Sequence, residues 1–215
     1  MKLYSYFRSS AAYRVRIALN LKGLAYETVP VHLLKDGGQQ LSDSYRSLNP
    51  TALVPTLVDG DLAVGQSMAI LEYLEETHPA PALLPADAKG RARVRAIAQT
   101  IACDIHPLNN LRVLKYLKHE MGVGEEAKNE WYRHWIALGL ASLEAMLVRS
   151  ALTGRFCCGD EPGMADACLV PQLFNARRME CDVSAFPTVL RIDAACAELD
   201  AFRKAAPSSQ PDAEG

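Results

Sequence analysis

The segment FRSSAAYRVRIAL at residues 7–19 decides how the first part of the chain is interpreted. Its first residue ends a short run rich in aromatic residues, Lys2–Phe7, which is typical of a β-strand. Ser9 and Ser10 then stand where a helix cap is favoured, and apolar side chains recur behind them at helical spacing. The segment therefore predicts a strand that passes directly into a helix, and Lys22-Gly23 marks the end of that helix.

The alternation of strand and helix signals continues outward from this segment as far as residue 80. Further strands are expected at Tyr26–Leu33, Leu53–Val58 and Leu62–Val64, and further helices at Gln39–Leu48 and from Ser67 to Glu76. The sequence Asp59-Gly60-Asp61 favours a tight hairpin between the last two strands. The resulting order, βαβαββα, predicts a thioredoxin-like α/β domain over residues 1–80.

A different pattern begins after Thr77–Pro85, a proline-rich stretch that cannot continue a helix and is interpreted as a linker. Only helical patterns follow, so residues 86–215 are predicted to form an all-α domain whose polar tail, 207–215, frays. The expected helices are one that Asp87 caps and that runs to Ile105, then Trp131–Val148, Met164–Met179 and Thr188–Leu199. The candidate core residues of the second helix are Trp131, Trp135, Leu138, Leu143 and Met146.

The composition is that of a soluble globular protein, with 49% hydrophobic and 22% charged residues in a chain of 215. A formal net charge of −2 does not provide the basic field that binding to nucleic acid or to an anionic membrane needs. No apolar run is long enough to span a bilayer, and the first residues lack the apolar region of a secretory signal. We therefore expect a cytoplasmic protein that binds neither nucleic acid nor membrane.

The cysteine and histidine pattern does not favour a metal site. The six cysteines form no Cys-x-x-Cys pair, and the five histidines do not stand at ligand spacing from them. Cys103, Cys168 and Cys196 fall inside apolar helical patterns, which is typical of small core residues in a reducing compartment. We expect no bound metal.

Three short segments of the first domain carry groups that suit an anion or an extended peptide. Ser9 and Ser10 lie at a helix start that favours an anion, so a hydroxyl there can hold a thiolate, although an ordinary helix cap uses the same residues. Val54-Pro55 in the cis form turns the backbone of Val54 toward an extended peptide, whereas a trans proline would simply begin an edge strand. Gln66-Ser67 opens a helix and suits a carboxylate, or is a plain cap.

The segment at 7–19 resembles the Arg-Ser-Ser-Cys-x-Trp-Arg-Val-Arg-Ile-Ala-Leu signature of the zeta-class glutathione transferases. Other segments resemble that class in the same order, namely Lys35–Gln40, Leu48-Asn49-Pro50, Val54–Leu57, Gln66-Ser67, Asp104–Asn110, Val170-Pro171-Gln172 and Gln210-Pro211-Asp212. The resemblance covers nearly the whole chain. It implies a glutathione transferase-like fold, a homodimer, and a glutathione-dependent cis–trans isomerase of the maleylacetoacetate and maleylpyruvate type.

The resemblance also implies which residues form the site. Glutathione is expected to be bound by Ser9, Gln40 (or its neighbour Gln39), Val54, Pro55, Gln66, Ser67, His106 and Asn110. The catalytic group is expected to comprise Ser9, Ser10 and Arg8. A dicarboxylate substrate is expected to be bound by Arg8, Arg112 and Arg178, because guanidinium groups bind carboxylates bidentately; each arginine alone is also compatible with a surface ion pair.

Two positions depart from the family pattern. Ala11 stands where the signature often has cysteine, so the sulfur nucleophile is expected to come from glutathione. The helix that begins at Met164 follows Gly163 rather than the usual serine or threonine, but Asp166 is present, so the capping interaction is expected to form.

Several functions remain open on the sequence. The Lys35–Gln40 segment favours maleylacetoacetate as substrate, whereas Arg112 and the absence of a cysteine at Ala11 favour maleylpyruvate. A general zeta-class transferase acting on haloacids is a further alternative. The last alternative is a non-catalytic binding module, against which the intact set of glutathione-site residues argues.

Overall fold

A computed structural model describes residues 1–214 of the chain. The last position of the expected tail, Gly215, lies outside the described residues. The chain forms two compact units: Met1–Leu83 together with the chain from Ala197 onward, and Leu84–Cys196 between them. Each unit is described by itself.

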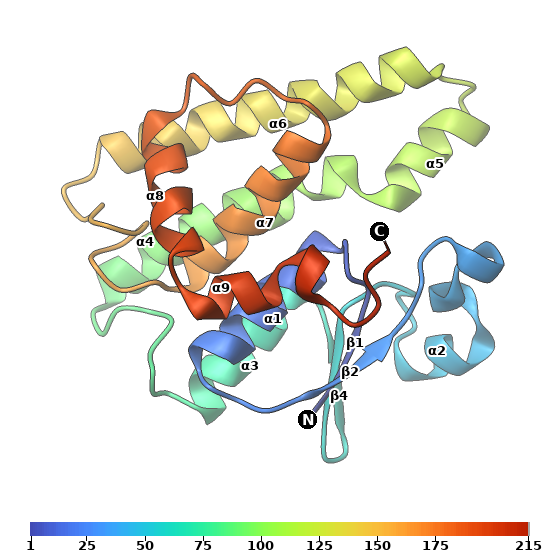
Figure 1. The fold of residues 1–215 in the computed structure, drawn as a ribbon, viewed down its shortest axis with the longest axis horizontal. Coiled ribbons are helices and arrows are strands. Elements are labelled where there is room, and N and C mark those ends of the chain that lie inside the picture. Colours follow the sequence, from blue (N-terminus) through green and yellow to red (C-terminus); the bar gives the residue numbers. More distant parts are fainter. Residues whose placement is uncertain (215) are drawn as a thin grey trace. The chain divides into compact units, whose positions relative to one another are not determined.

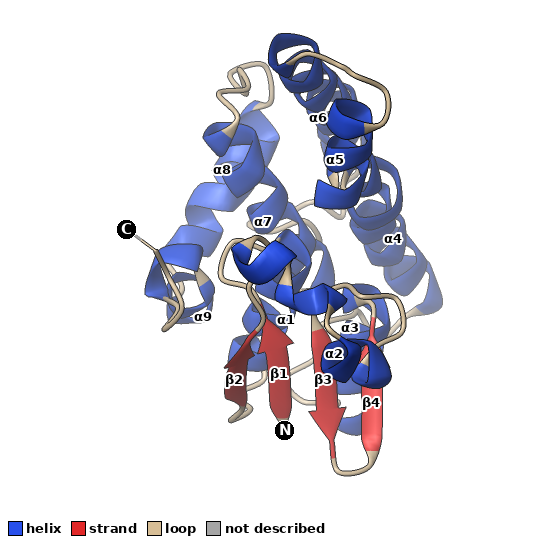
Figure 2. Cartoon of the chain, turned by 90° about the vertical axis from the view of Figure 1, so that its right-hand side faces the viewer, coloured by secondary structure: helices blue, strands red, loops and turns tan. Residues whose placement is uncertain are grey.

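The first unit is built on a four-stranded sheet in the order β2-β1-β3-β4, shown in Figure 2. The strands are β1 (Lys2–Ser5), β2 (Glu27–Pro30), β3 (Thr56–Asp59) and β4 (Leu62–Gly65). β1 runs parallel to β2 and antiparallel to β3, and β3 pairs antiparallel with β4. Leu3 lies opposite Leu57 in this register, and both side chains are fully buried in the core. β1 ends before the expected Phe7, because the chain turns there toward the first helix and the N–H of Ser9 donates to the carbonyl of Tyr6.

The helices of the first unit complete the expected order βαβαββα. They are α1 (Ser10–Leu21), α2 (Asp43–Leu48) and α3 (Ser67–Thr77), with 3-10 turns at Lys35–Gly37 and Gln39–Leu41. Figure 1 shows α1 and α3 on one side of the sheet and α2 on the other. The single helix expected at Gln39–Leu48 is divided at Ser42, because the side chain of Ser42 caps α2 by accepting from the N–H of Tyr45. The hairpin at Gly60 forms as expected, with a left-handed φ of 61° that glycine adopts readily.

The end of the chain belongs to the first unit, which corrects the expected boundary of a helical domain at 86–215. The short helix α9 (Asp200–Ala205) packs on α1, where Arg16 Nε donates to the carbonyl of Ala205 over 2.9 Å. Asn20 Nδ2 donates to the carbonyl of Ala201 over the same distance. The tail does not fray as expected, since the buried Gln210 donates through Nε2 to two backbone carbonyls. The boundary was missed because the sequence of a short polar helix such as α9 does not indicate which unit the helix packs against.

The second unit is helical, as expected. Its helices are α4 (Ala88–Gln99), α5 (Leu111–His119), α6 (Glu125–Val148), α7 (Met164–Arg178) and α8 (Pro187–Ala197). Asp87 caps α4 by accepting from the N–H of Gly90, and the chain then forms a π-helical turn at Thr100–Ile105. The 3-10 turn Pro107–Asn109 connects this turn to α5, a helix that the sequence analysis did not anticipate.

The core positions of α6 differ from those expected. The buried residues are Tyr132, Ile136, Leu140, Leu143 and Leu147, so only Leu143 was identified correctly. Leu138 is 54% exposed, and Trp131, Trp135 and Met146 are half-buried. The reason is that both faces of this helix carry large apolar residues, so the sequence alone does not indicate which stripe faces the core.

Asp166 forms the capping interaction expected at the start of α7. Its Oδ2 accepts from the N–H of Gly163 over 2.9 Å, and its Oδ1 accepts from the N–H of Cys157 over 2.8 Å. Cys168 and Cys196 are buried as expected, whereas Cys103 is exposed, which corrects its assignment to the core. Within residues 1–214, no helix is both long and apolar enough to cross a membrane.

Candidate functional site

The turn from β1 into α1 holds the two serines. The Oγ of Ser9 accepts from the N–H of Ala12 over 3.2 Å, so this residue is the cap of α1. Because no residue within 1–214 accepts its hydroxyl hydrogen, Ser9 keeps a donor for a bound group. The first turn of α1 carries no acidic residue, which leaves the positive end of the helix available to an anion. Ser9 is half-buried and Ser10 is buried, so Ser9 presents the more accessible hydroxyl.

A fully buried arginine is hydrogen-bonded to the strand and the turn that precede Ser9. Arg16 Nη2 donates to the carbonyl of Phe7 over 2.9 Å, and Nη1 donates to the Oγ of Ser5 over 3.1 Å. Burial lowers the pKa of Arg16 to about 10, so its guanidinium remains charged at neutral pH. The positive charge of Arg16 is therefore in direct contact with the segment that carries Ser9.

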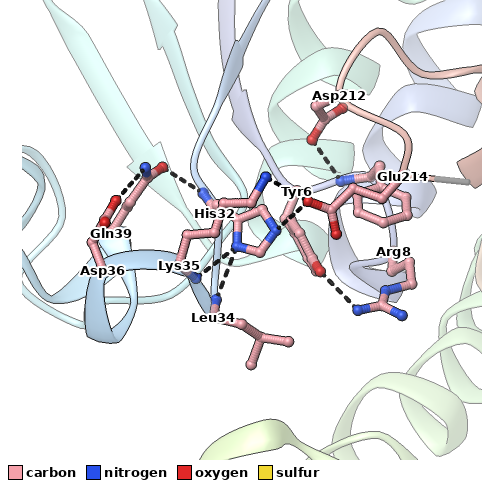
Figure 3. Close-up of polar contacts among 10 residues, drawn as sticks. Tyr6, Arg8, His32, Leu34, Lys35, Asp36, Gln39, Asp212 and Glu214 are labelled. Atoms are coloured by element: carbon pink, nitrogen blue, oxygen red, sulfur yellow. Dashed lines mark hydrogen bonds and ion pairs between the residues drawn. The ribbon is translucent and has the colours of Figure 1, made fainter.

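Arg8 has an orientation set by its aromatic neighbours. Its Nη2 donates to the phenol of Tyr6 over 3.0 Å (Figure 3). Its guanidinium lies 5.2 Å from the centre of the Phe7 ring. Arg8 itself is exposed. The aromatic contacts hold an accessible guanidinium one residue before Ser9.

The two adjacent glutamines have different environments. Gln39 is exposed, and its amide bridges the N–H of His32, over 2.8 Å, and the carboxylate of Asp36. Gln40 is buried, and its Oε1 has no hydrogen-bond partner among residues 1–214. A buried amide oxygen without a donor is costly unless a ligand or water supplies one. Gln40 therefore fits a ligand-binding role, whereas the amide of Gln39 is bonded to His32 and Asp36.

The Val54–Pro55 peptide is cis, the first of the two forms that the sequence left open. Val54 is buried in one cluster with Tyr6 and Phe7, so the structure brings it to the segment that precedes Ser9. The carbonyl of the preceding Leu53 accepts from the phenol of Tyr45 and from Asn49 Nδ2, over 2.8 and 2.9 Å. These bonds fix the loop before β3.

The start of α3 combines an unusual backbone with a buried charge. Gln66 has a φ of 66°, a left-handed conformation that is costly for a residue with a side chain and that concentrates at ligand sites. Ser67, the first residue of α3, is buried, and its Oγ accepts from Nη1 of the buried Arg14 over 3.2 Å. Helix N–H groups, a hydroxyl and a guanidinium thus converge where the sequence predicts a carboxylate site.

The second unit carries His106, Asn110 and Arg112 around its 3-10 turn. Asn110 caps α5 by accepting from the N–H of Arg112 over 3.1 Å, and the Arg112 side chain is exposed. The turn is attached to α6, because Trp131 Nε1 donates to the carbonyl of Leu108 and Asn109 Nδ2 donates to the carbonyl of Tyr132.

Arg178 lies at the end of α7, where its positive charge acts on the phenol of Tyr132. Burial raises the pKa of Tyr132 and the positive charge of Arg178 opposes that effect, so the phenol is protonated at neutral pH. Its neighbour Arg177 forms an ion pair with Asp193 over 2.7 Å. The two arginines are therefore distinct, with Arg177 engaged in packing α7 to α8 and Arg178 exposed at the end of the helix.

The structure brings the sequence-predicted residues into two groups. One, in the first unit, contains Arg8, Ser9, Ser10, Gln40, Val54, Pro55, Gln66 and Ser67. The other, in the second unit, contains His106, Asn110, Arg112 and Arg178. The sequence analysis did not identify Arg14, Arg16 or Tyr132 as site residues. Charged residues on the buried face of a predicted helix were the signal for the two arginines.

Comparison with known proteins identifies the family. Residues 3–82 match the glutathione S-transferase N-terminal domain. A probable maleylacetoacetate isomerase of Vibrio cholerae is 52% identical, with 98% of this chain and 97% of that protein covered.

Two solved structures match over 100% of both chains with a TM-score of 0.96. One is a bacterial zeta-class maleylpyruvate isomerase in its holo form, 51% identical, and the other is the maleylacetoacetate isomerase of Methylobacterium extorquens AM1 with bound malonate and glutathione, 44% identical. The sequence identity to these proteins extends over nearly the whole chain, and the fold is the same. The chain belongs to the zeta-class glutathione transferases, the family of the maleylacetoacetate and maleylpyruvate isomerases.

Proposed function

We propose that the protein is a glutathione-dependent cis–trans isomerase of a maleyl diacid, with maleylacetoacetate, which becomes fumarylacetoacetate, as the first candidate substrate. The observation that carries the proposal is the donor group of Ser9 at the positive end of α1, with the buried charge of Arg16 below it. Such a site stabilises a thiolate at neutral pH.

The residues of the first unit fit glutathione part by part. The orphaned Oε1 of Gln40 is an acceptor for its peptide, and Val54 offers backbone groups before a cis proline. The start of α3 at Ser67, with Arg14 behind it, suits the γ-glutamyl carboxylate. His106 and Asn110 are proposed to complete the binding set from the second unit.

Catalysis divides into three tasks for this chain. When bound, glutathione supplies the sulfur nucleophile that adds to the cis double bond and leaves after rotation about the resulting single bond. Ser9 donates a hydrogen bond that keeps this sulfur ionised, and Ser10 supports the same turn. Arg8, Arg112 and Arg178 bind the two carboxylates of the substrate and stabilise the negative charge that develops on its oxygen.

Maleylpyruvate is the second candidate substrate. Arg112, which is exposed in the first turn of α5, favours it, because its position resembles the maleylpyruvate-type site. The absence of a cysteine at Ala11 points in the same direction. Conjugation of glutathione to haloacids would be a side activity of the same thiolate site.

The proposal includes a homodimer in the cytoplasm that binds no nucleic acid. The exposed Leu138 and Val148 on α6 and the balanced charge of the chain are compatible with this assignment. Light scattering at micromolar concentration is expected to give the mass of two chains, and a monomer mass would contradict the dimer.

The deciding experiment compares turnover of maleylacetoacetate and maleylpyruvate by dialysed enzyme, each with and without glutathione. We expect turnover only with glutathione, which is recovered unconsumed. Activity of the thiol-free enzyme would overturn the mechanism. Net loss of glutathione would favour a transferase instead.

A further inference from the structure

The last residues of the chain are bound to the segment that carries Ser9. Asp212 Oδ2 accepts from the backbone N–H of Phe7 over 3.0 Å (Figure 3). This bond joins residues 205 positions apart, and its donor lies two residues before Ser9. The tail therefore contacts the turn directly, although it carries none of the predicted site residues.

Both backbone groups of Phe7 are held by charged side chains from different parts of the chain. Its N–H donates to Asp212, and its carbonyl accepts from the buried Arg16. The negative charge of Asp212 also favours the charged form of Arg16 against the effect of burial. Hydrogen bonds to ionised groups are the stronger ones in proteins, so this pair determines where the Phe7 peptide lies.

Glu214 extends the contact to the loop that leads to Gln40. Its carboxylate accepts a hydrogen bond from His32 Nε2 over 3.2 Å and forms an ion pair with Lys35. The His32 ring accepts at Nδ1 from the N–H groups of Leu34 and Lys35, so its Nε2 carries the hydrogen donated to Glu214. Glu214 and Lys35 are exposed whereas Asp212 is half-buried, so the bond to Phe7 is the stronger part of the attachment.

We propose that Asp212 is a positioning residue for glutathione: its carboxylate holds the Phe7 peptide so that the Ser9 hydroxyl is placed for the sulfur. This inference rests on the proposed function, because it assumes that glutathione binds at Ser9. It assigns the C-terminal tail a role in the site rather than only in packing α9.

The test separates the position of the carboxylate from its charge. Asp212→Asn keeps an acceptor for the Phe7 N–H and loses the charge, whereas Asp212→Glu keeps the charge and displaces the acceptor by one methylene. Asp212→Ala removes both. Asp200→Asn is the matched control, because it removes one carboxylate from an exposed position at the start of α9.

Two measurements are made on each variant. Amide hydrogen exchange of Phe7 in the ligand-free protein reports the bond itself, and calorimetric titration with glutathione alone gives the dissociation constant. For Asp212→Ala we expect faster exchange at Phe7 and binding weakened about five- to tenfold, the scale of one hydrogen bond. Asp212→Glu is expected to show smaller changes in the same direction in both measurements. It takes the place of the alanine variant in the comparison if that variant does not fold. Asp212→Asn and Asp200→Asn are expected to bind like the wild type.

The outcomes distinguish this inference from the proposed function. Wild-type affinity in Asp212→Glu and Asp212→Ala, despite faster exchange at Phe7, overturns the positioning role. Weak binding by Asp212→Asn, equal to that of the alanine variant, shows that charge acts rather than position and also overturns it. If the wild type binds glutathione but isomerises neither diacid, the proposed function fails while the inference stands. If the wild type does not bind glutathione, both fail.

Discussion

The ammonium of Lys22 lies 2.8 Å from the Oε2 of Glu75, and the two side chains are 0% and 7% exposed. Lys22 Nζ also donates to the carbonyls of His78 and Pro81, and the same Glu75 oxygen accepts from the N–H of Leu83. The pair therefore joins the ends of α1 and α3 to the proline-rich segment that follows them. The sequence analysis interpreted that segment only as a linker.

Removing one partner of this pair is expected to destabilise the protein strongly. Lys22→Met leaves the Glu75 carboxylate buried without its cation, and breaking such a pair costs about 3–5 kcal/mol. Urea unfolding monitored by circular dichroism measures the loss. The matched control is Lys2→Met, because Lys2 and Glu27 form an exposed pair whose loss is expected to cost less than about 1 kcal/mol. Equal effects of the two substitutions would show that burial does not determine the cost.

Gly139 is expected to be required by the close approach of α6 to the π-helical turn. A Cβ at this position would lie 2.2 Å from Ile105 Cγ1 and 2.3 Å from its Cδ1. Gly139→Ala is therefore expected to lower the free energy of unfolding by about 1–3 kcal/mol, as overpacking does. The double variant Gly139→Ala with Ile105→Ala should be less destabilised than the two single effects added together. Gly124→Ala meets nothing within 4 Å and is the control.

Arg178 and Arg112 are expected to affect the diacid far more than glutathione. Loss of a charge-assisted hydrogen bond of about 1.5–3 kcal/mol lowers kcat/KM by roughly one to two orders of magnitude. Arg178→Ala or Arg112→Ala should therefore impair isomerisation and leave conjugation of an uncharged aromatic electrophile almost unchanged. Arg177→Ala is the control, since that side chain pairs with Asp193. Ser9→Ala should impair both reactions, and wild-type isomerisation by both arginine variants would exclude the arginine site.

Tyr132→Phe is expected to act through Arg178, since it removes the phenol on which the charge of that guanidinium acts. We expect a rise in KM for the diacid of a few-fold, on the scale of about 1 kcal/mol, and no change in KM for glutathione. In the Arg178→Ala background, the same substitution should have no further effect on KM. Additive effects would place Tyr132 outside this interaction.

The attachment of Glu214 is expected to be lost in acid. The hydrogen bond and charge of Lys35 hold the pKa of Glu214 below its ordinary value of 4.5. A depressed pKa in the folded state means that the contact stabilises above the unfolded pKa and disappears as the pH falls through the folded one. A carboxyl-detected NMR titration should give a pKa for Glu214 below 4.5, and Lys35→Gln should raise it. An unchanged value in that variant would contradict the ion pair as its cause.

The sequence by itself determined the local elements and much of the candidate site. The period of apolar residues, the caps at Ser9 and Asp87 and the turn at Gly60 predicted helices and strands, because these signals depend on neighbours only a few residues away. The helix starts at Ser9 and Ser67 were predicted for the same reason, because a helix start is a local structure; that these residues and Gln66 bind glutathione stays a prediction from the resemblance of their segments.

Only the tertiary structure decided what depends on distant residues. It separated Gln40 from Gln39 by their partners, placed Tyr132 beside Arg178, and attached α9 and Asp212 to the first unit. Each of these facts is a contact between segments far apart in the chain, or a hydrogen bond that one of two similar side chains makes and the other does not. Periodicity describes a segment but not its neighbour in space, so burial and hydrogen-bond partners follow only from how the segments pack.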